Sequence, residues 1–312
     1  MSMRLTLEQK RKQYRTIYGA IWETPRIFVK DLALLLDCTP TAATNRLKEA
    51  YDCGYIVGPD IRKKSYSNLQ EYMYFINSRD PELLYLEYKE YPSLVYHAKT
   101  LGFCNMWVIA EEKIDIKGEI VLEGHRSDYY TSYAPNQTWE TSIEIMRKKV
   151  DTFDTGNYTP INYIRTHFGE IMDFRLDSEI LYRYFRQDMR RNLKPVMKNH
   201  QISAETLYGF LNNLQNTCTV ATHYYPDSLP MYDSYLFMIE TDYEDFIINL
   251  FSELPSSVSF FKIDDRLFVS AYIPWKYVRV SDLQISANES TIPILLISLK
   301  RKGPMNQPFR FC

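Results

Sequence analysis

Hydrophobic residues recur every three or four positions in three stretches near the start of the chain, which predicts three helices. The first begins at Thr6, with Gln9 placed to complete a capping box, and ends before Pro25. The second covers residues 29–37. The third runs from Thr39 to Gly54, with a polar cap at its start and a glycine suited to the left-handed conformation at its end. The last two have the spacing of a helix-turn-helix.

The third predicted helix has an apolar stripe and a polar face. The polar side chains are those of Thr41, Thr44, Asn45, Arg46 and Lys48. After it, residues 55–57 read as a strand, 58–60 as a turn and 61–64 as a return strand that carries Arg62, Lys63 and Lys64. Such groups can contact phosphates and base edges, so the pattern predicts a winged helix-turn-helix that binds double-stranded DNA. The alternative is an ordinary helical hairpin with a solvated charged face.

The pattern then changes to that of a β-α-β-β unit. Residues 72–76 predict a strand, a helix begins at Asp80, and residues 95–99 and 105–109 predict two further strands. Residues 39–111 can be laid on 202–274 at a constant offset of 163 without a gap. Hydrophobic positions agree along most of this length. We therefore expect a tandem duplication and an α+β fold.

The second copy of the helix-turn-helix lacks the polar reading face of the first. Asn45, Arg46 and Lys48 correspond to Tyr208, Gly209 and Leu211, respectively. We expect the second copy to be a packing element. The predicted domains are a winged helix-turn-helix at 1–67, a ferredoxin-like sensor domain with an extra hairpin at 68–175, a degenerate helix-turn-helix at 176–230 and a second ferredoxin-like domain at 231–312.

The segment between the copies has no counterpart in the repeat. Residues 119–122 and 129–133 predict a hairpin around Gly124, and 139–150 predict an amphipathic helix; near the other end of the chain, 292–299 predict a late strand. A hairpin tip with a cation and an acceptor can hold a small zwitterion or carboxylate. The candidate effector-binding residues are Asn105, His125, Arg126 and Asp128. The alternative is an exposed polar turn.

The net charge of the 312-residue chain is only −2, but its distribution favours a local DNA contact. Residues 1–70 hold twelve Lys or Arg against seven Asp or Glu. The five cysteines are scattered, which predicts reduced thiols and no metal site. We found no apolar run of membrane-spanning length, no signal peptide and no Walker, GxGxxG, HExxH or GxSxG motif, so we expect a cytoplasmic protein without a cofactor.

The predicted winged helix-turn-helix followed by a βαββ unit resembles the Lrp/AsnC (feast/famine) family of prokaryotic transcriptional regulators. The likeness is carried by Leu32-Ala33 through Arg46-Leu47 to Gly54-Tyr55-Ile56, and by 100–105, where Asn105 replaces the Asp of a family "GxxD" hairpin. The resemblance implies a sequence-specific DNA-binding regulator that responds to a small-molecule effector and is not an enzyme. This chain departs from the family in its doubled length and in its degenerate second head.

Two alternatives to a regulator stay open, and the single intact helix-turn-helix predicts an assembly. Relatives of this family are siroheme decarboxylases with a two-headed architecture, so the enzymatic alternative is a tetrapyrrole enzyme. A protein-interaction scaffold is the third reading. Because one intact head reads only one half-site, we expect a homodimer, with Tyr72, Tyr74 and Trp107 shared across its interface.

Overall fold

The computed structural model describes residues 5–278, 292–305 and 310–311. The first three helices, α1 (Leu7–Glu23), α2 (Val29–Leu35) and α3 (Pro40–Asp52), lie where the sequence predicts them. The capping box at Thr6 is present, and the Thr39 hydroxyl accepts a hydrogen bond from an amide of the first turn of α3. The three helices bury one apolar core.

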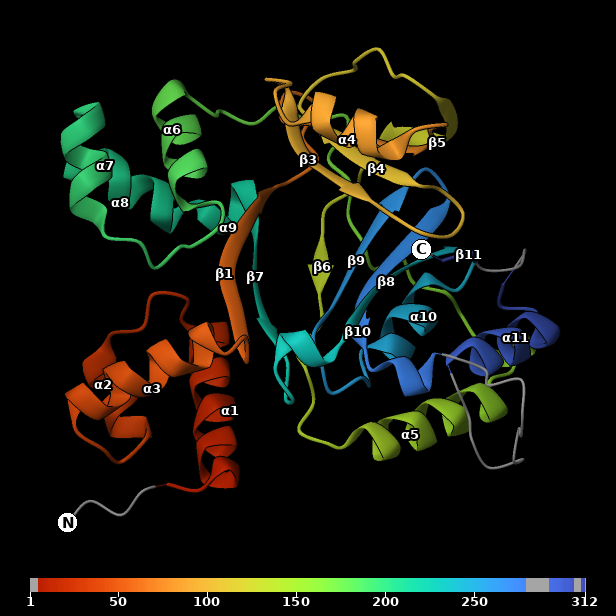
Figure 1. Cartoon of the computed structure of the whole chain (residues 1–312), viewed down its shortest axis with the longest axis horizontal. Coiled ribbons are helices and arrows are strands. Elements are labelled where there is room, and N and C mark those ends of the chain that lie inside the picture. Colours follow the sequence, from red (N-terminus) through yellow and green to blue (C-terminus); the bar gives the residue numbers. More distant parts are fainter. Residues whose placement is uncertain (1–4, 279–291, 306–309, 312) are drawn as a thin grey trace.

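The predicted wing is wrong. Residues 56–63 form a single strand, β1 (Ile56–Lys63), which pairs antiparallel with β7 (Cys218–Tyr224). A register shift between Val57 and Asp60 takes the place of the predicted turn. The result is a two-stranded ribbon between segments about half the chain apart, drawn in orange and teal in Figure 1.

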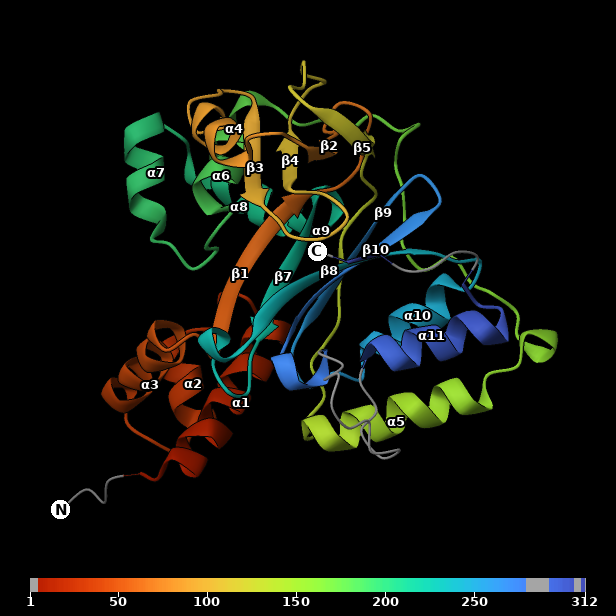
Figure 2. The same cartoon turned by 45° about the vertical axis from the view of Figure 1, so that its right-hand side comes forward.

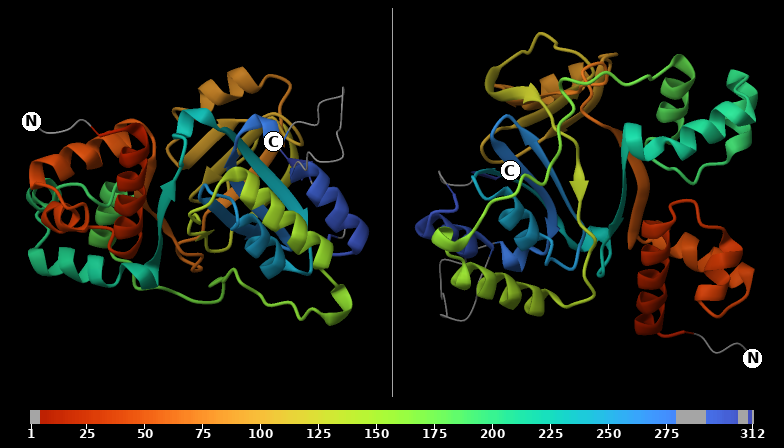
Figure 3. Two further views of the ribbon diagram at one scale, coloured as in Figure 1. Left: turned by 90° about the horizontal axis from the view of Figure 1, so that it is seen from below. Right: turned by 180° about the vertical axis from the view of Figure 1, so that it is seen from behind.

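A second group of helices lies at the other end of this ribbon. It consists of α6 (Leu176–Phe185), α7 (Leu193–His200), α8 (Ala204–Asn212) and the short α9 (Leu214–Thr217). These helices have their own core, to which Ile61 of β1 and Cys218 of β7 contribute. Both helix groups lie on one side of the ribbon and the sheets lie on the other (Figure 3).

The other strands in the described part of the chain form two antiparallel sheets. The first has the order β3-β4-β2-β5 and consists of β2 (Tyr72–Asn77), β3 (Leu94–Lys99), β4 (Met106–Ala110) and β5 (Glu119–His125). The second has the order β11-β8-β10-β9-β6 and consists of β6 (Tyr130–Thr131), β8 (Asp233–Glu240), β9 (Val258–Ile263), β10 (Arg266–Ile273) and β11 (Arg310–Phe311). The predicted α+β class with antiparallel sheets is confirmed.

Each sheet has helices on its outer face. The first carries α4 (Pro81–Tyr88), and the second carries α5 (Trp139–Thr152), α10 (Glu244–Phe251) and α11 (Ile292–Lys302), which lie together in Figure 2. The described residues also form three short 3-10 helices: η1 (Thr155–Asn157), η2 (Leu229–Met231) and η3 (Trp275–Tyr277).

The two sheets pack against each other through their inner faces. Phe75 of β2 stacks on Phe268 of β10 with ring centroids 4.9 Å apart, and Phe268 stacks on Phe261 of β9 at the same distance. All three rings are buried. The inner faces of the two sheets therefore share one aromatic core, and the helices cover the outer faces.

Both halves of the chain contain a strand-helix-strand-strand unit: β2-α4-β3-β4 in the first half and β8-α10-β9-β10 in the second. Helices α4 and α10 are separated by the offset of 163 residues found in the sequence. Origin by duplication and the four domain boundaries stay predictions.

Two predicted elements are wrong. The hairpin around Gly124 does not form, because β5 joins the first sheet and β6 joins the second. The late strand is α11, in which Ile292, Leu295, Leu296 and Leu299 are buried at helical spacing. A continuous apolar run does not distinguish a buried strand from a buried helix.

Candidate functional site

The β1–β7 ribbon turns a row of polar side chains toward the sheets. Asp60 lies opposite Ala221 and Arg62 lies opposite Thr219, and His223 is two residues further along β7. Alternate residues of a strand point to the same face, so these side chains share one surface. They line a cavity between the ribbon and the two sheets.

The cavity has two adjoining parts, with volumes of about 380 Å³ and 280 Å³. The side chains that line both parts are those of Asp60, Arg62, Gln187, His223, Ser259, Ser270 and Tyr272. The ribbon, the α6–α7 connection and the second sheet therefore each supply part of the wall. Its size is in the range of binding sites for small organic molecules.

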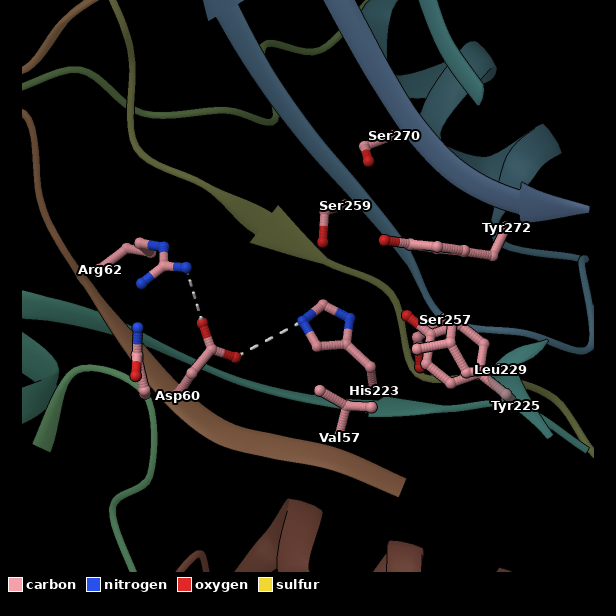
Figure 4. A pocket seen from close by; sticks show the side chains of 11 residues that line it. Val57, Asp60, Arg62, His223, Tyr225, Leu229, Ser257, Ser259, Ser270 and Tyr272 are labelled. Carbon is pink, nitrogen blue, oxygen red and sulfur yellow. Dashed lines mark ion pairs between the residues drawn. The ribbon is translucent and has the colours of Figure 1, made fainter. Parts of the chain in front are cut away.

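Asp60 stands between a cation and a histidine (Figure 4). One carboxylate oxygen is 3.5 Å from Nε2 of His223, and the other is 3.6 Å from a terminal nitrogen of Arg62. Burial opposes the charge on Asp60, but His223 and Arg62 outweigh it and hold the pKa of the carboxyl below its ordinary value. Asp60 is therefore an anion that can orient the His223 ring.

Two arginines and two carboxylates line the cavity. Arg62 and Arg186 both line it, and their carboxylate neighbours are Asp60 and Glu71. Glu71 is already paired with Arg126 at 2.6 Å. One arginine charge is thus left over, and a guanidinium group suits a carboxylate ligand because it can donate two parallel hydrogen bonds.

The wall opposite the ribbon is aromatic. Trp107 of β4 meets Tyr96 edge to face at 5.1 Å, and Phe261 meets Tyr129 in the same way at 5.3 Å. Burial raises the pKa of Tyr129 to about 12, so its hydroxyl stays neutral. Tyr272 points from β10 toward the space above His223 (Figure 4). These rings can receive a flat ligand.

Taken together, these groups can hold an organic anion and transfer a proton. The arginines can bind a carboxylate, the rings can contact a planar body, and a histidine oriented by a carboxylate can act as a general acid or base. His223 and Asp60 come from strands that only the fold brings together.

The predicted DNA-reading residues of α3 are divided between solvent and protein. Thr41, Thr44, Asn45 and Lys48 are exposed. Arg46 instead turns back to α1: its Nε donates to Oε1 of Gln13 at 2.7 Å, and it also pairs with Glu49. Arg46 thus holds α3 against α1.

The predicted wing residues do not form an exposed basic surface. Arg62 lines the cavity, and Lys63 is nearly buried, with its Nζ 2.6 Å from Glu179. Lys64 donates to the carbonyl oxygen of Gln215 at 2.7 Å. The strand pairing with β7 explains this difference, because it places the basic residues between the ribbon and its neighbours.

The predicted effector-binding residues are not brought together at a hairpin tip. Arg126 is buried against Glu71, and Asp128 accepts hydrogen bonds from the amide and the hydroxyl of Ser65. Asn105 exchanges two hydrogen bonds with the backbone of Ser78. His125 is exposed and meets Tyr72 edge to face.

The residues proposed for a dimer interface are also placed differently. Tyr72 and Tyr74 are buried under α4, so they are not free to be shared with a second copy. Trp107 is partly buried and lines the cavity. The predicted interface through the two tyrosines is wrong, and the homodimer itself stays a prediction.

Sequence reasoning missed Asp60, His223 and Arg186 as site residues. Asp60 was read as a turn residue, and a lone histidine on a strand is usually structural. A usable signal was the alternation of Thr219, Ala221 and His223, which marks one face of a strand with a titratable group at its end.

No protein-family model matches the chain, and no curated protein matches it. Among solved structures, it is similar to two crystal structures of the siroheme decarboxylase NirDL, one of them in co-complex with an iron-uroporphyrin III analogue. The identities are 11% and 10%, the TM-score is 0.46 for both, and each match covers 96% of this chain and 90% of the other. The likeness fits the Lrp/AsnC-type resemblance only loosely.

One prediction is corrected at this point. The sequence was read as that of a protein without enzymatic activity, whereas both matching structures are of an enzyme.

Within the described residues, no helix is long and apolar enough to cross a membrane. In that same part of the chain, no three His, Cys, Asp or Glu side chains are grouped as metal ligands would be.

Proposed function

We propose that this chain is an enzyme that acts on a planar, carboxylate-bearing molecule in the cavity between the ribbon and the sheets. The observation that carries the proposal is the placement of His223 and Asp60 beside two arginines and opposite an aromatic wall. Acid–base group, anion anchor and planar surface are the three parts that such a reaction needs.

Decarboxylation is the reaction that suits these residues. Arg62 or Arg186 binds one carboxylate of the substrate and fixes its position. When the bond between the substrate carbon and the reacting carboxylate breaks, carbon dioxide leaves and the electron pair stays on the carbon. His223, oriented by Asp60, acts as the general acid and supplies a proton to that carbon. Water then returns the proton to His223.

A tetrapyrrole with several carboxylates belongs to this substrate class and was the enzymatic alternative drawn from the sequence. Its flat ring would lie against Trp107 and Tyr96, and its acidic side chains would reach the arginines. The cavity volumes mean that a macrocycle would extend beyond the enclosed part, toward the exposed Gln187. Smaller aromatic carboxylates would fit inside.

The first test is direct binding. Iron uroporphyrin titrated into the protein is expected to shift its absorbance band, and benzene polycarboxylates are expected to compete. Arg62→Gln should weaken binding by about tenfold or more, because a hydrogen bond between charged groups contributes on the order of 1.5–3 kcal/mol. Arg175→Ala is the matched control, since Arg175 is exposed and its ion pair in the described part of the chain is with Asp173. Binding that is unaffected by Arg62→Gln would place the ligand elsewhere.

The second test is turnover. Carbon dioxide release from the bound tetrapyrrole is expected from the wild-type chain, and His223→Ala should slow it by about 100-fold or more, as loss of a general acid does. The binding constant should change much less. Equal rates in His223→Ala and wild type would remove His223 from the reaction.

A second candidate function is DNA binding through α3, which the exposure of Thr41, Thr44, Asn45 and Lys48 favours. Lys48→Ala should weaken DNA binding and lower the slope of affinity against salt by about one unit if it contacts a phosphate. Lys198→Ala, on the second helix group, is the control. DNA fragments that bind both variants and wild type equally would exclude α3 as the reading helix.

A further inference from the structure

The two helix groups contact each other through the loops between their first two helices, which meet beside the ribbon in Figure 1. Arg26, between α1 and α2, donates to two carbonyl oxygens of the α6–α7 connection. One belongs to Met189, and the other belongs to Arg191 at 3.1 Å. The Arg26 guanidinium also lies over the ring of Phe185, 5.6 Å from its centroid.

The second helix group makes a similar contact in the opposite direction. Arg190, between α6 and α7, donates from its two terminal nitrogens to the carbonyl oxygens of Pro25 and Ile27, each at 2.9 Å. At the repeat offset of 163 residues, Arg190 corresponds to Ile27, one position from Arg26. The two loops therefore exchange arginines almost symmetrically, and we call these four hydrogen bonds the arginine clasp.

The arginine clasp brings two like charges together. Burial and the nearby charge of Arg190 lower the pKa of Arg26. Asp188 moderates this repulsion, and its carboxylate also accepts a hydrogen bond from the amide of Arg190 at 2.7 Å. Because like charges oppose such an arrangement, the carbonyl hydrogen bonds must hold it in place.

The segment held by the arginine clasp also holds the site. The carbonyl oxygen of Arg186 accepts from the amide of Ile61 at 3.0 Å, and the amide of Met189 donates to the carbonyl of Pro59 at 2.8 Å. These two hydrogen bonds lie on either side of Asp60 in β1. The same segment places the side chains of Arg186 and Gln187 in the cavity wall.

We propose that Arg26 and Arg190 are positioning residues for the cavity, acting through residues 186–191 on Asp60. The contacts form a continuous path. The arginine clasp holds residues 186–191, and these residues hydrogen-bond to the backbone on both sides of Asp60. Neither arginine lines the cavity. Breaking the clasp should therefore loosen the carboxylate that orients His223 and the arginine that would bind substrate. The effect on substrate rests on the proposed function, whereas the effect on Asp60 does not.

The test without ligand is hydrogen exchange followed by NMR. In Arg190→Ala and in Arg26→Ala, the amides of Ile61 and Met189 should exchange about tenfold faster than in wild type, because local opening becomes easier. Arg191→Ala is the matched control, because its side chain donates to the carbonyl oxygen of Tyr184 within its own helix group. Arg190→Lys keeps the positive charge but lacks the two terminal nitrogens that reach the carbonyl oxygens of Pro25 and Ile27. It should restore part of the protection, and it serves if the alanine variant does not fold.

The test with ligand measures the affinity for iron uroporphyrin. Arg190→Ala should weaken binding about tenfold, as small displacements of positioned groups do, while Arg191→Ala should leave it unchanged. If the amides of Ile61 and Met189 exchange at the same rates in Arg190→Ala as in Arg191→Ala and wild type, the positioning role is overturned. Faster exchange in a chain whose wild type binds no carboxylate ligand supports the positioning role and contradicts the proposed function.

Discussion

Glu71 and Arg126 form an ion pair of 2.6 Å in which both side chains are shielded from solvent. Glu71 stands directly before β2 and Arg126 directly after β5. The guanidinium also donates to the carbonyl oxygens of Lys63 and Ser127. Burial works against the charge of Arg126, but Glu71 outweighs it and raises the pKa of the guanidinium. The pair thus fixes the end of β1 to the first sheet, just below the cavity.

Replacing one member of this pair should destabilise the fold strongly. Glu71→Gln leaves a buried guanidinium without its counter-ion, for which we expect a loss of about 3–5 kcal/mol in the free energy of unfolding, measured with urea. Glu82→Gln is the control, because its pair with Lys99 is exposed and contributes about 1 kcal/mol or less. Similar losses for the two variants would mean that Arg126 is not desolvated in solution.

Gly124 is required by the crossing of β5 over the second sheet. A Cβ atom at this position would lie 2.6 Å from Cγ2 of Ile263, which is buried and branched and cannot turn away. Gly124→Ala should therefore cost about 1–3 kcal/mol of stability.

Gly209 provides the matched control for that substitution. It lies inside α8, and nothing is within 4 Å of a Cβ built there. Gly209→Ala should stabilise the protein by about 0.4–1 kcal/mol. A thermal unfolding experiment that moves both variants in the same direction would contradict the packing of β5 against Ile263.

The sequence was sufficient for elements whose signals are local. Thr6 and Thr39 cap α1 and α3 as predicted, because a cap depends on residues within one turn. The apolar run of residues 72–76 and the proline after Asp80 placed β2 and α4. These elements recur at the offset of 163, which is why the repeat could be detected.

The ribbon could not be predicted in this way. Residues 56–63 carry both strand and turn signals, and the turn reading fails because β7 supplies a partner from the far half of the chain. A pairing between such distant segments leaves no local pattern. Asp60 and Arg62 lie on β1, so the site could not be predicted without the ribbon. The basic residues of β1 were instead assigned to a DNA-binding wing.

Thiol reactivity checks the burial of β7. Burial raises the pKa of Cys218 to about 12, so this thiol should not react with a maleimide at pH 8 until the protein unfolds. Cys53 is exposed at the end of α3 and should react at once. Cys53→Ser is the control that removes the fast reaction. Cys312 lies outside the described residues, so mass spectrometry must assign each product. Fast labelling of Cys218 in the native protein would contradict the β1–β7 pairing.

Asp60 should make the stability of the protein depend on pH in acid. Its pKa in the folded state is below the ordinary value of 3.8, because His223 and Arg62 outweigh its burial. A group with a lowered folded pKa stabilises the fold fully above its unfolded pKa, and this contribution is lost as the pH falls through the folded value. For Asp60 the contribution is therefore complete above about pH 5 and declines below about pH 4.

The variant Asp60→Asn isolates this contribution. Its free energy of unfolding should be lower than that of wild type at pH 6, and the difference between the two proteins should shrink as the pH is lowered toward 2.5. Urea unfolding at a series of pH values measures both. Asp227→Asn is the control, because Asp227 pairs with Arg11 at a half-exposed site. A difference between wild type and Asp60→Asn that stays constant from pH 6 to pH 2.5 would mean that the Asp60 carboxylate is not held by His223 and Arg62, and the proposed acid–base pair would fail with it.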